Sequence, residues 1–177
     1  MEICLQNLGA YNNGYLLYEW VELPVSDKKL EEVLDKIKVC HGDKKYYDSV
    51  GCPYEEYMIA DYSGFPFNVG EYDNIEELNE FAEQYGSFDD TEKEVLEALI
   101  EDGMEIEDAV ETVNRHDYFY VEGNDAEELA ENFLMESGGL ECLPKETLER
   151  YFDFDSYGRD MEFDYKKTAN GYVQTRY

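Results

Sequence analysis

Residues 92–111, EKEVLEALIEDGMEIEDAVE, decide the fold class because they combine a helical pattern with an extreme charge. The stretch has nine acidic residues and a single basic one, Lys93. Like charges three or four places apart on a helix repel by roughly 0.2–0.5 kcal/mol per pair. Its apolar residues recur at helical spacing and form one stripe: Val95, Leu96, Leu99 and Ile100. We therefore expect a packed helix whose outer charge has a function of its own.

The composition predicts packed domains rather than a disordered acidic tail. The chain has 177 residues, which suits one large domain or two or three small ones. Hydrophobic residues make up 43%, with 17 Tyr and 9 Phe, which is more than disordered acidic segments contain. No apolar run approaches about 18 residues, and the N-terminal MEICLQNLGAYNNGY lacks the basic n-region of a secretory signal. We expect a cytoplasmic protein without a membrane span, with its four cysteines reduced.

The net charge is the most unusual property of the chain. There are 44 acidic and 14 basic residues, a net of −30. Solubility of a small domain needs a net charge of only about 2–8, whereas thirty charges correspond to roughly 50 Å of duplex DNA. Residues 71–111 have 17 acidic residues and one basic residue. Laid along a helix, that is one net charge per ~3.8 Å, close to the ~3.4 Å of one DNA strand. The pattern favours a phosphate-like array over a surface that only confers solubility.

Residues 1–70 predict a small N-terminal α+β domain, with twelve acidic and six basic residues. YNNG at 11–14 is typical of a turn because Asn and Gly tolerate positive φ. Ser26 predicts the N-cap of a helix with Leu30 and Ile37 among its apolar residues. Three stretches are rich in strand-forming residues: EICLQNL (2–8), YLLYEWVEL (15–23) and EEYMIADY (55–62).

Residues 71–115 predict a helical domain with acidic outer faces. Caps and apolar spacing indicate three helices. The first starts at Asn74 with Glu77 in its first turn, the second runs from Asp90 or Thr91 to near Gly103, and the third from about Glu105 to Asn114.

Residues 116–177 predict a C-terminal α+β domain. The elements expected are a strand in DYFYVEG (117–123), a helix capped by Asn124 and closed by Gly138, a short helix from Pro144 to Tyr151, and a terminal hairpin around TANG (168–171). Within YGRD (157–160), we expect Arg159 to form an internal ion pair that fixes this segment. The predicted fold class is α+β, as an elongated chain of three small domains.

The sequence predicts neither an enzyme nor a cofactor. It contains no Gly-rich phosphate loop, no H-E-x-x-H and no nucleophile elbow, and no residue is assigned a catalytic role. Cys40, His41 and Cys52 are conceivable zinc ligands, but their spacing fits no common pattern. Buried thiols and a surface histidine are the better interpretation.

One stretch imitates a calcium-binding loop. DFDSYGRDMEFD (153–164) has Asp153, Asp155 and Gly158 at the first, third and sixth positions of such a loop. The twelfth position is Asp164 rather than the usual bidentate Glu. An acidic loop next to the terminal hairpin is the better interpretation, and we expect no bound metal.

The chain resembles the ArdA antirestriction family from residue 3 to its C-terminus. The most specific features are the Asn-x-Gly turn followed by a W-x-x-L-P ending, and the YGRD sequence. Three blocks occur in the order of the family: LGAYNNGYLLYEWVELP (8–24), ADYSGFPFNVGEYDNIEELNEFAE (60–83) and YFDFDSYGRDMEFD (151–164).

The resemblance implies a DNA mimic that inhibits type I restriction–modification enzymes. Members of the family are three small domains strung into a curved, elongated dimer. A similar chain would occupy the DNA-binding channel of the specificity and methyltransferase subunits. It would bind no nucleic acid, membrane or cofactor. We also expect a homodimer, with an apolar contact patch in residues 116–177.

The residues expected to face the partner are acids of the predicted helices. They are Glu76, Glu77, Glu80, Glu83, Asp89, Asp90, Glu92, Glu94, Glu97, Glu101, Asp102, Glu105, Glu107, Asp108, Glu111, Glu127, Glu128 and Glu131. Charge alone leaves other functions open. The chain could be an acidic chaperone, or a mimic directed at a nucleoid protein or polymerase. A calcium-binding module is a further alternative.

Overall fold

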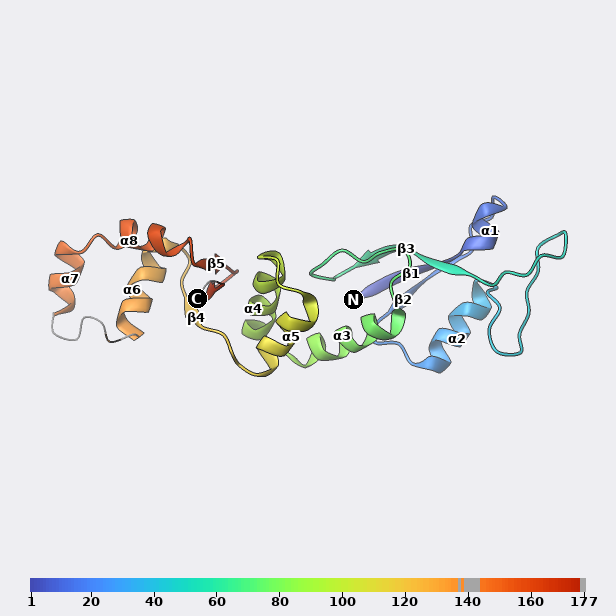
Figure 1. Cartoon of the computed structure of the whole chain (residues 1–177), viewed down its shortest axis with the longest axis horizontal. Helices are drawn as coiled ribbons and strands as arrows, with labels where there is room; N and C mark the ends of the chain where they lie inside the picture. The colour runs from blue at the N-terminus through green and yellow to red at the C-terminus, as the bar shows by residue number, and fades with distance from the viewer. Residues whose placement is uncertain (137, 139–143, 176–177) are drawn as a thin grey trace. The chain divides into compact units, whose positions relative to one another are not determined.

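The chain forms two compact units, Met1–Ser87 and Phe88–Tyr177, in a computed structural model that describes residues 1–136, 138 and 144–175 (Figure 1). Both units combine helices with a small sheet, so the predicted α+β class is confirmed. The three-domain division is not confirmed, because the acidic helices expected in one middle domain are shared between the two units.

The first unit is a three-stranded antiparallel sheet with its two longer helices on one face. Its elements are β1 (Glu2–Asn7), α1 (Leu8–Asn12), β2 (Tyr18–Glu22), α2 (Asp27–Lys36), β3 (Tyr57–Ser63) and α3 (Ile75–Ser87). β1 is the central strand, in the order β2-β1-β3. Ser26 caps α2 as predicted, since its side chain accepts a hydrogen bond from the Lys29 amide.

The core of this unit lies between the sheet and the two longer helices, which Figure 1 shows on the same side of the sheet. It consists mainly of aliphatic side chains from all five elements: Ile3, Leu5, Val21, Val33, Leu34, Ile37, Ile59, Ile75 and Leu78. Asn79 joins α3 to the segment before α2, because its side chain both accepts from the Val25 amide and donates to the Val25 carbonyl, each at 2.8 Å. These contacts place α3 in the first unit.

The connection between β1 and β2 differs from the expected turn. Residues 8–12 form the short helix α1, and only Gly14, at φ 80°, has the positive φ expected of the YNNG stretch. The reason is Asn7, which is fully buried and caps α1 by accepting from the Ala10 amide at 2.7 Å. Its amide group also donates to the carbonyls of Ile37 and Lys38, at 2.9 and 3.0 Å. Asn7 therefore ties the end of β1 to the end of α2.

The second unit contains five helices in its described part and a second three-stranded antiparallel sheet, in the order β4-β6-β5. Its elements are α4 (Asp90–Glu101), α5 (Ile106–Asn114), β4 (Tyr120–Glu122), α6 (Ala126–Glu136), α7 (Lys145–Tyr151), α8 (Phe154–Met161), β5 (Tyr165–Lys167) and β6 (Gly171–Gln174). The hairpin around residues 168–171 is confirmed.

A close approach between α6 and α8 organises the C-terminal part of this unit. The core here contains the following side chains: Val121, Leu129, Ala130, Leu148, Phe154, Met161, Tyr165 and Tyr172. Gly158 of α8 faces the start of α6, and a Cβ on it would lie 1.7 Å from the Ala126 carbonyl oxygen. The glycine of YGRD is thus required by helix packing.

The expectation of an acidic loop at residues 153–164 is wrong. Asp153 is the N-cap of α8 and accepts from the Ser156 amide at 3.0 Å. Asp155 forms an ion pair with Arg159 one turn later, at 2.8 Å. These acids serve a helix rather than a loop, so the calcium-loop alternative is also contradicted. The internal pair expected for Arg159 is confirmed, but both partners are exposed and the contact stays within α8.

The start of α6 is a smaller correction. Its capping side chain is Asp125, which accepts from the Glu128 amide at 2.9 Å, rather than Asn124. Asn124 instead donates to the Glu128 carboxylate through both its backbone and its side-chain nitrogen. The capping pair is therefore shifted by one residue relative to the expectation.

We predict that Gly158→Ala destabilises the second unit, because the added methyl group would force α8 away from the α6 backbone. Overpacking of this kind costs about 1–3 kcal/mol. The single Trp of the chain, Trp20, lies in β2 of the first unit. Its fluorescence therefore follows the first unit, while far-ultraviolet circular dichroism follows the whole chain. Urea unfolding should show the destabilisation by circular dichroism and not by fluorescence.

The matched control is Gly86→Ala in α3, where a Cβ would meet nothing within 4 Å. It should be neutral or stabilising by up to about 1 kcal/mol. Equal stability of the Gly158→Ala variant and the wild type would contradict the packing role.

Candidate partner-binding surface

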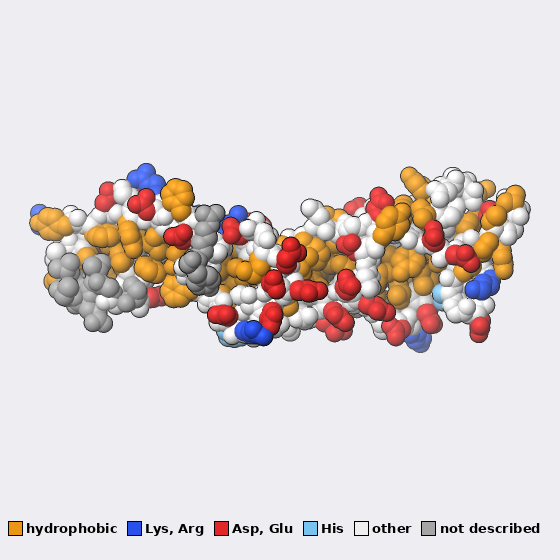
Figure 2. Space-filling model, in the orientation of Figure 1, with side chains coloured by type: hydrophobic (Ala, Val, Ile, Leu, Met, Phe, Trp, Pro, Cys, Tyr) orange, Lys and Arg blue, Asp and Glu red, His pale blue; other side chains and the backbone are white. Residues whose placement is uncertain are grey.

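The first group of candidate acids lies on α3. Its buried positions, Ile75, Leu78, Phe81 and Ala82, face the core of the first unit. Glu76, Glu80 and Glu83 lie within about 60° of one another around the helix axis, at 3.6 residues per turn. They are exposed, as is Glu77 beside them. Figure 2 shows acidic side chains gathered over this helix. The apolar stripe thus fixes a helix whose outer face is a row of carboxylates.

The second group lies on α4 and α5, whose inner faces are also apolar. Asp89 caps α4 in a reciprocal capping box, in which its carboxylate accepts from the Glu92 amide and Glu92 accepts from the Asp89 amide, each at 2.8 Å. In α5, Glu107 and Asp108 occupy the first turn, and Glu105 is the N-cap. Acidic side chains in a first turn interact favourably with the helix dipole, by about 0.3–1 kcal/mol each. This placement offsets part of the repulsion between the carboxylates.

Exposure divides the eighteen predicted acids into two classes. Fourteen are exposed, and four are only partly exposed: Glu92, Glu94, Glu97 and Glu131. The sequence pattern alone did not separate the two classes, because all eighteen occupy acidic stretches of helices.

Glu94 differs from the others because it is an internal acceptor. Its Oε2 accepts hydrogen bonds from the Thr168 hydroxyl at 2.9 Å and from the Asn170 amide at 3.1 Å. The Asn170 side chain donates to Oε1, and the Tyr120 hydroxyl lies 3.5 Å from Oε2. Glu94 therefore fastens α4 to the turn of the β5–β6 hairpin. The Glu94 carboxylate therefore stabilises the fold through these internal hydrogen bonds.

Other acids among the eighteen have cationic partners within the chain. Lys166 lies 3.7 Å from Glu101, Lys145 lies 3.2 Å from Glu131, and Arg115 pairs with Glu111. Such pairs, with exposed cations, contribute only about 0–1 kcal/mol to stability. They lower the local negative charge, so these positions contribute less to an anionic surface.

Four further acids also have interactions within the chain: Asp89, Glu92, Glu97 and Glu128. The ten acids that remain, from both units, are called the free carboxylates below. In the described part of the chain, none of them has an ion pair or a side-chain hydrogen bond to another residue. They are Glu76, Glu77, Glu80, Glu83, Asp90, Asp102, Glu105, Glu107, Asp108 and Glu127. All ten are exposed. They are the residues available to a partner.

Nearby tyrosines respond to this negative charge. Burial raises the pKa of Tyr57, and the charge of Glu76 raises it further. Burial, followed by the charges of Glu92 and Asp89, raises the pKa of Tyr118 in the same way. Both phenols are therefore neutral near pH 7 and do not add to the anionic surface.

The basic residues of the first unit are confined to one region. Its six lysines all lie between Lys28 and Lys45, in α2 and the following segment. Asp35 in this region pairs with Lys44 and accepts from the Tyr46 hydroxyl at 2.9 Å. The hydrogen bond from Lys44, helped by that from Tyr46, lowers the pKa of Asp35. The carboxylates of α3 are thus separated in the sequence from the lysines of the unit.

The conceivable zinc ligands have other partners. The Cys40 sulfur lies 3.3 Å from the Tyr46 carbonyl, and the Nδ1 of His41 lies 2.9 Å from the Val39 carbonyl. The Nε2 of His41 lies 3.3 Å from Asp35 without forming a hydrogen bond. Cys52 is exposed, and Cys40 and His41 are both partly buried, so the expectation of buried thiols and a surface histidine is wrong here. Among the described residues, no three metal-binding side chains are close enough to hold an ion; Cys142 lies outside them.

The described helices include none long and apolar enough to cross a membrane.

A family model described as antirestriction protein (ArdA) matches residues 3–174, nearly the whole chain. The chain belongs to the ArdA antirestriction family. No curated protein matches the chain significantly. The ArdA family is a family of inhibitors. As a member, the chain is an antirestriction protein that acts against restriction enzymes.

We predict that Glu94→Ala destabilises the second unit by about 2–3 kcal/mol, because its hydrogen-bond donors would be left without their charged acceptor. The control, Glu83→Ala on the exposed face of α3, should change stability by no more than about 0.5 kcal/mol. Urea unfolding followed by circular dichroism compares the two variants. Indistinguishable transitions would show that Glu94 is an ordinary surface acid.

Proposed function

We propose that the chain is a DNA mimic that occupies the DNA-binding channel of a type I restriction–modification enzyme, formed by its specificity and methyltransferase subunits. The observation that carries the proposal is the set of ten free carboxylates, held on helices whose inner faces are buried. A partner with lysines and arginines for phosphates can meet these carboxylates without breaking any contact of the chain. Neither a nucleic acid nor a cofactor is needed for this inhibition.

The charge density of α3 supports the comparison with DNA. Four free carboxylates lie between Glu76 and Glu83, over about 10.5 Å of helix axis at 1.5 Å per residue. That is one charge per about 3.5 Å, and one strand of DNA has one charge per about 3.4 Å. The packed core keeps these charges on a fixed scaffold, so little ordering entropy is lost on binding.

The interactions expected in such a complex are those that normally position DNA, rather than those that recognise its base sequence. Phosphate contacts carry no direct sequence information, whereas contacts to base edges do. A chain that imitates phosphates should therefore inhibit type I enzymes with different recognition sequences. Inhibition restricted to a single recognition sequence would count against phosphate mimicry.

We predict that neutralising eight free carboxylates weakens inhibition far more than neutralising eight acids elsewhere. The test variant converts Glu to Gln and Asp to Asn at 76, 77, 80, 83, 102, 105, 107 and 108. For each lysine or arginine of the enzyme that no longer meets a carboxylate, the slope of log affinity against log salt should fall by about 1, as it does for phosphates. The assay is DNA cleavage and DNA binding by a purified type I enzyme, with increasing amounts of the variant across a salt series.

The matched control neutralises eight exposed acids of the first unit at 2, 22, 27, 31, 43, 55, 56 and 61, so that both variants have the same net charge. Equal inhibition by the two variants would show that the number of charges matters and their placement does not. If the enzyme is not inhibited but the wild-type chain displaces DNA from nucleoid proteins, the mimic is directed at another class of DNA-binding protein.

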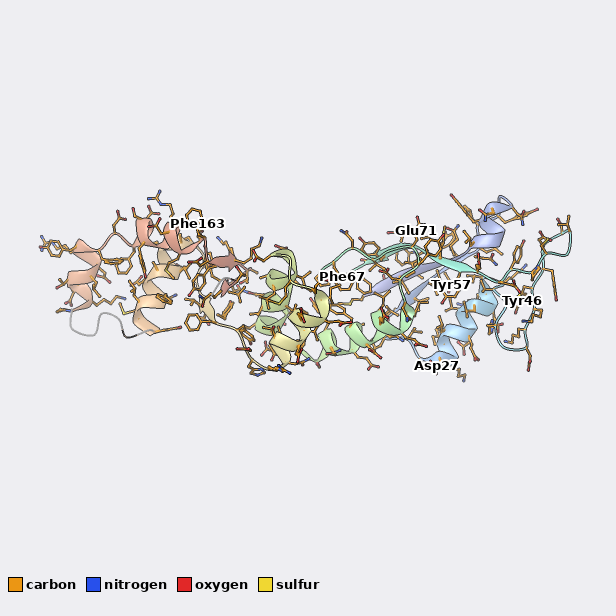
Figure 3. The ribbon with its side chains drawn as sticks, in the orientation of Figure 1. Asp27, Tyr46, Tyr57, Phe67, Glu71 and Phe163 are labelled. Carbon is orange, nitrogen blue, oxygen red and sulfur yellow. The ribbon has the colours of Figure 1, made fainter. Side chains whose placement is uncertain are left out.

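We also propose that the chain is a homodimer joined through its second unit. The support is exposed apolar surface in residues 116–177, where Tyr151 and Phe163 are 78% and 72% exposed and Phe119 and Met135 are also exposed. Phe163 is labelled in Figure 3. Sedimentation equilibrium at physiological salt should give twice the chain mass. Phe163→Ser should reduce the association, whereas a monomeric wild type over the micromolar range would exclude the dimer.

A further inference from the structure

A groove in the first unit has a chemistry that the free carboxylates do not explain. It has a volume of about 440 Å³ and lies where α2, β3 and the start of α3 meet. Side chains from all three elements line it, including Leu30 of α2, Tyr57 of β3 and Ile75 of α3. Three acidic side chains line it as well. The groove is thus apolar at its base and charged at its edge.

The base of the groove is formed by side chains that belong to the core. Leu30 and Tyr57 pack against the core and are only partly buried, while Ile75 is 5% exposed. They offer a surface against which an aliphatic chain can be removed from water, which contributes about 0.8 kcal/mol per CH₂ group. A small anion or a metal ion would gain nothing from such a base.

The edge of the groove is negative. Glu71, Asp73 and Glu76 line it, and Glu71 and Glu76 have no ion pair within the described residues. The Asp73 carboxylate accepts from the Gly70 amide at 2.7 Å. The backbone carbonyl of Glu71, which is labelled in Figure 3, accepts a hydrogen bond from the Ile59 amide of β3 at 2.9 Å. The carboxylates are therefore held next to the sheet rather than on a loose loop.

The N-terminus of α3 also borders the groove and carries a partial positive charge, equivalent to about +0.5. Three full negative charges outweigh it, so the groove attracts a cation. Among the described residues, no cluster is suited to a metal ion, which leaves an organic cation.

Two tyrosines distinguish between the possible organic cations. Tyr72 also lines the groove and is 72% exposed, so its ring has a free face. Tyr57 is a neutral phenol beside Glu76, since burial and that charge raise its pKa. A guanidinium group stacks on aromatic faces and pairs with carboxylates in a planar fork, whereas an ammonium group is a compact and strongly hydrated charge. The combination of rings and carboxylates favours arginine over lysine.

We propose that this groove is an anchor site for an arginine side chain of the partner protein. The aliphatic part of the arginine lies on Leu30 and Ile75, and its guanidinium group lies between Tyr72 and the carboxylates of Glu71 and Glu76. The inference rests on the proposed function, because the partner is the DNA-binding enzyme that the chain inhibits. It adds a fixed point of attachment to an otherwise redundant charge array.

The test compares two pairs of variants in the competition assay with a type I enzyme and DNA. Glu71→Gln with Glu76→Gln removes two charges from the groove, and Glu80→Gln with Glu83→Gln removes two from the outer face of α3. The groove pair should raise the concentration for half-inhibition at least tenfold more than the outer pair, although the net charges are equal. Thermal melting of each variant confirms that the first unit remains folded.

The second comparison changes no charge. Tyr72→Leu should raise the concentration for half-inhibition by about 2–30-fold, the range expected when a cation–π interaction is removed. Tyr15→Leu, at a position 62% exposed and outside the groove, should leave it unchanged.

Equal effects of the two glutamine pairs, together with wild-type inhibition by Tyr72→Leu, would overturn the anchor site and leave the DNA-mimic proposal intact. A wild-type chain that fails to compete with DNA at any salt concentration would overturn both. The two failures are therefore distinguishable in one series of measurements.

Discussion

Electrostatic self-repulsion is the constraint on which the structure depends. A chain with a net charge of −30 has to fold with only 14 basic residues to oppose 44 acidic ones. The repulsion between neighbouring acids on a helix is small, at roughly 0.2–0.5 kcal/mol per pair. A fully buried aliphatic side chain contributes about 1.5–3 kcal/mol, so each turn with one apolar residue facing a core can support several repelling acids. This explains why the most acidic helices also have continuous buried stripes, such as Val95, Leu96 and Leu99 in α4.

Local signals in the sequence predict most elements of the fold. Ser26 indicates the cap of α2, the start of α4 is placed within a residue, and the terminal hairpin follows from its turn. The failures arise where a polar residue has a role that only tertiary contacts reveal. Asn7 sits in an apolar strand pattern, and nothing nearby indicates that its side chain caps a helix. Similarly, the acids of residues 153–164 have the spacing of a loop, whereas the packing of Gly158 against α6 requires a helix.

The candidate surface is predictable in character and not in detail. Helical periodicity correctly places most of the eighteen acids on exposed faces, because the apolar stripe determines which face is buried. Periodicity cannot show that Glu94 serves the hairpin, since Thr168 and Asn170 lie 74 and 76 residues away in the sequence. It also misses the groove, whose residues come from three segments of the first unit. Periodicity also does not predict that α3 belongs to the first unit, because the hydrogen bonds between Asn79 and Val25 span 54 residues.

The buried Asn7 affects how the first unit opens. A five-residue helix such as α1 is too short to be stable alone, and an isolated one would fray continuously. Here the first turn of α1 is hydrogen-bonded to the side chain of Asn7, which also donates to the carbonyls of Ile37 and Lys38. The backbone amide of Asn7 donates to the Leu17 carbonyl at 2.9 Å. Releasing α1 would leave the side-chain oxygen of the fully buried Asn7 without its hydrogen-bond donor. Asn7 cannot turn to water without giving up its bonds to Ile37 and Lys38 as well. Solvent exchange at the Ala10 amide should therefore require the cooperative opening of the unit, which makes this short surface helix as slow to exchange as the central strand.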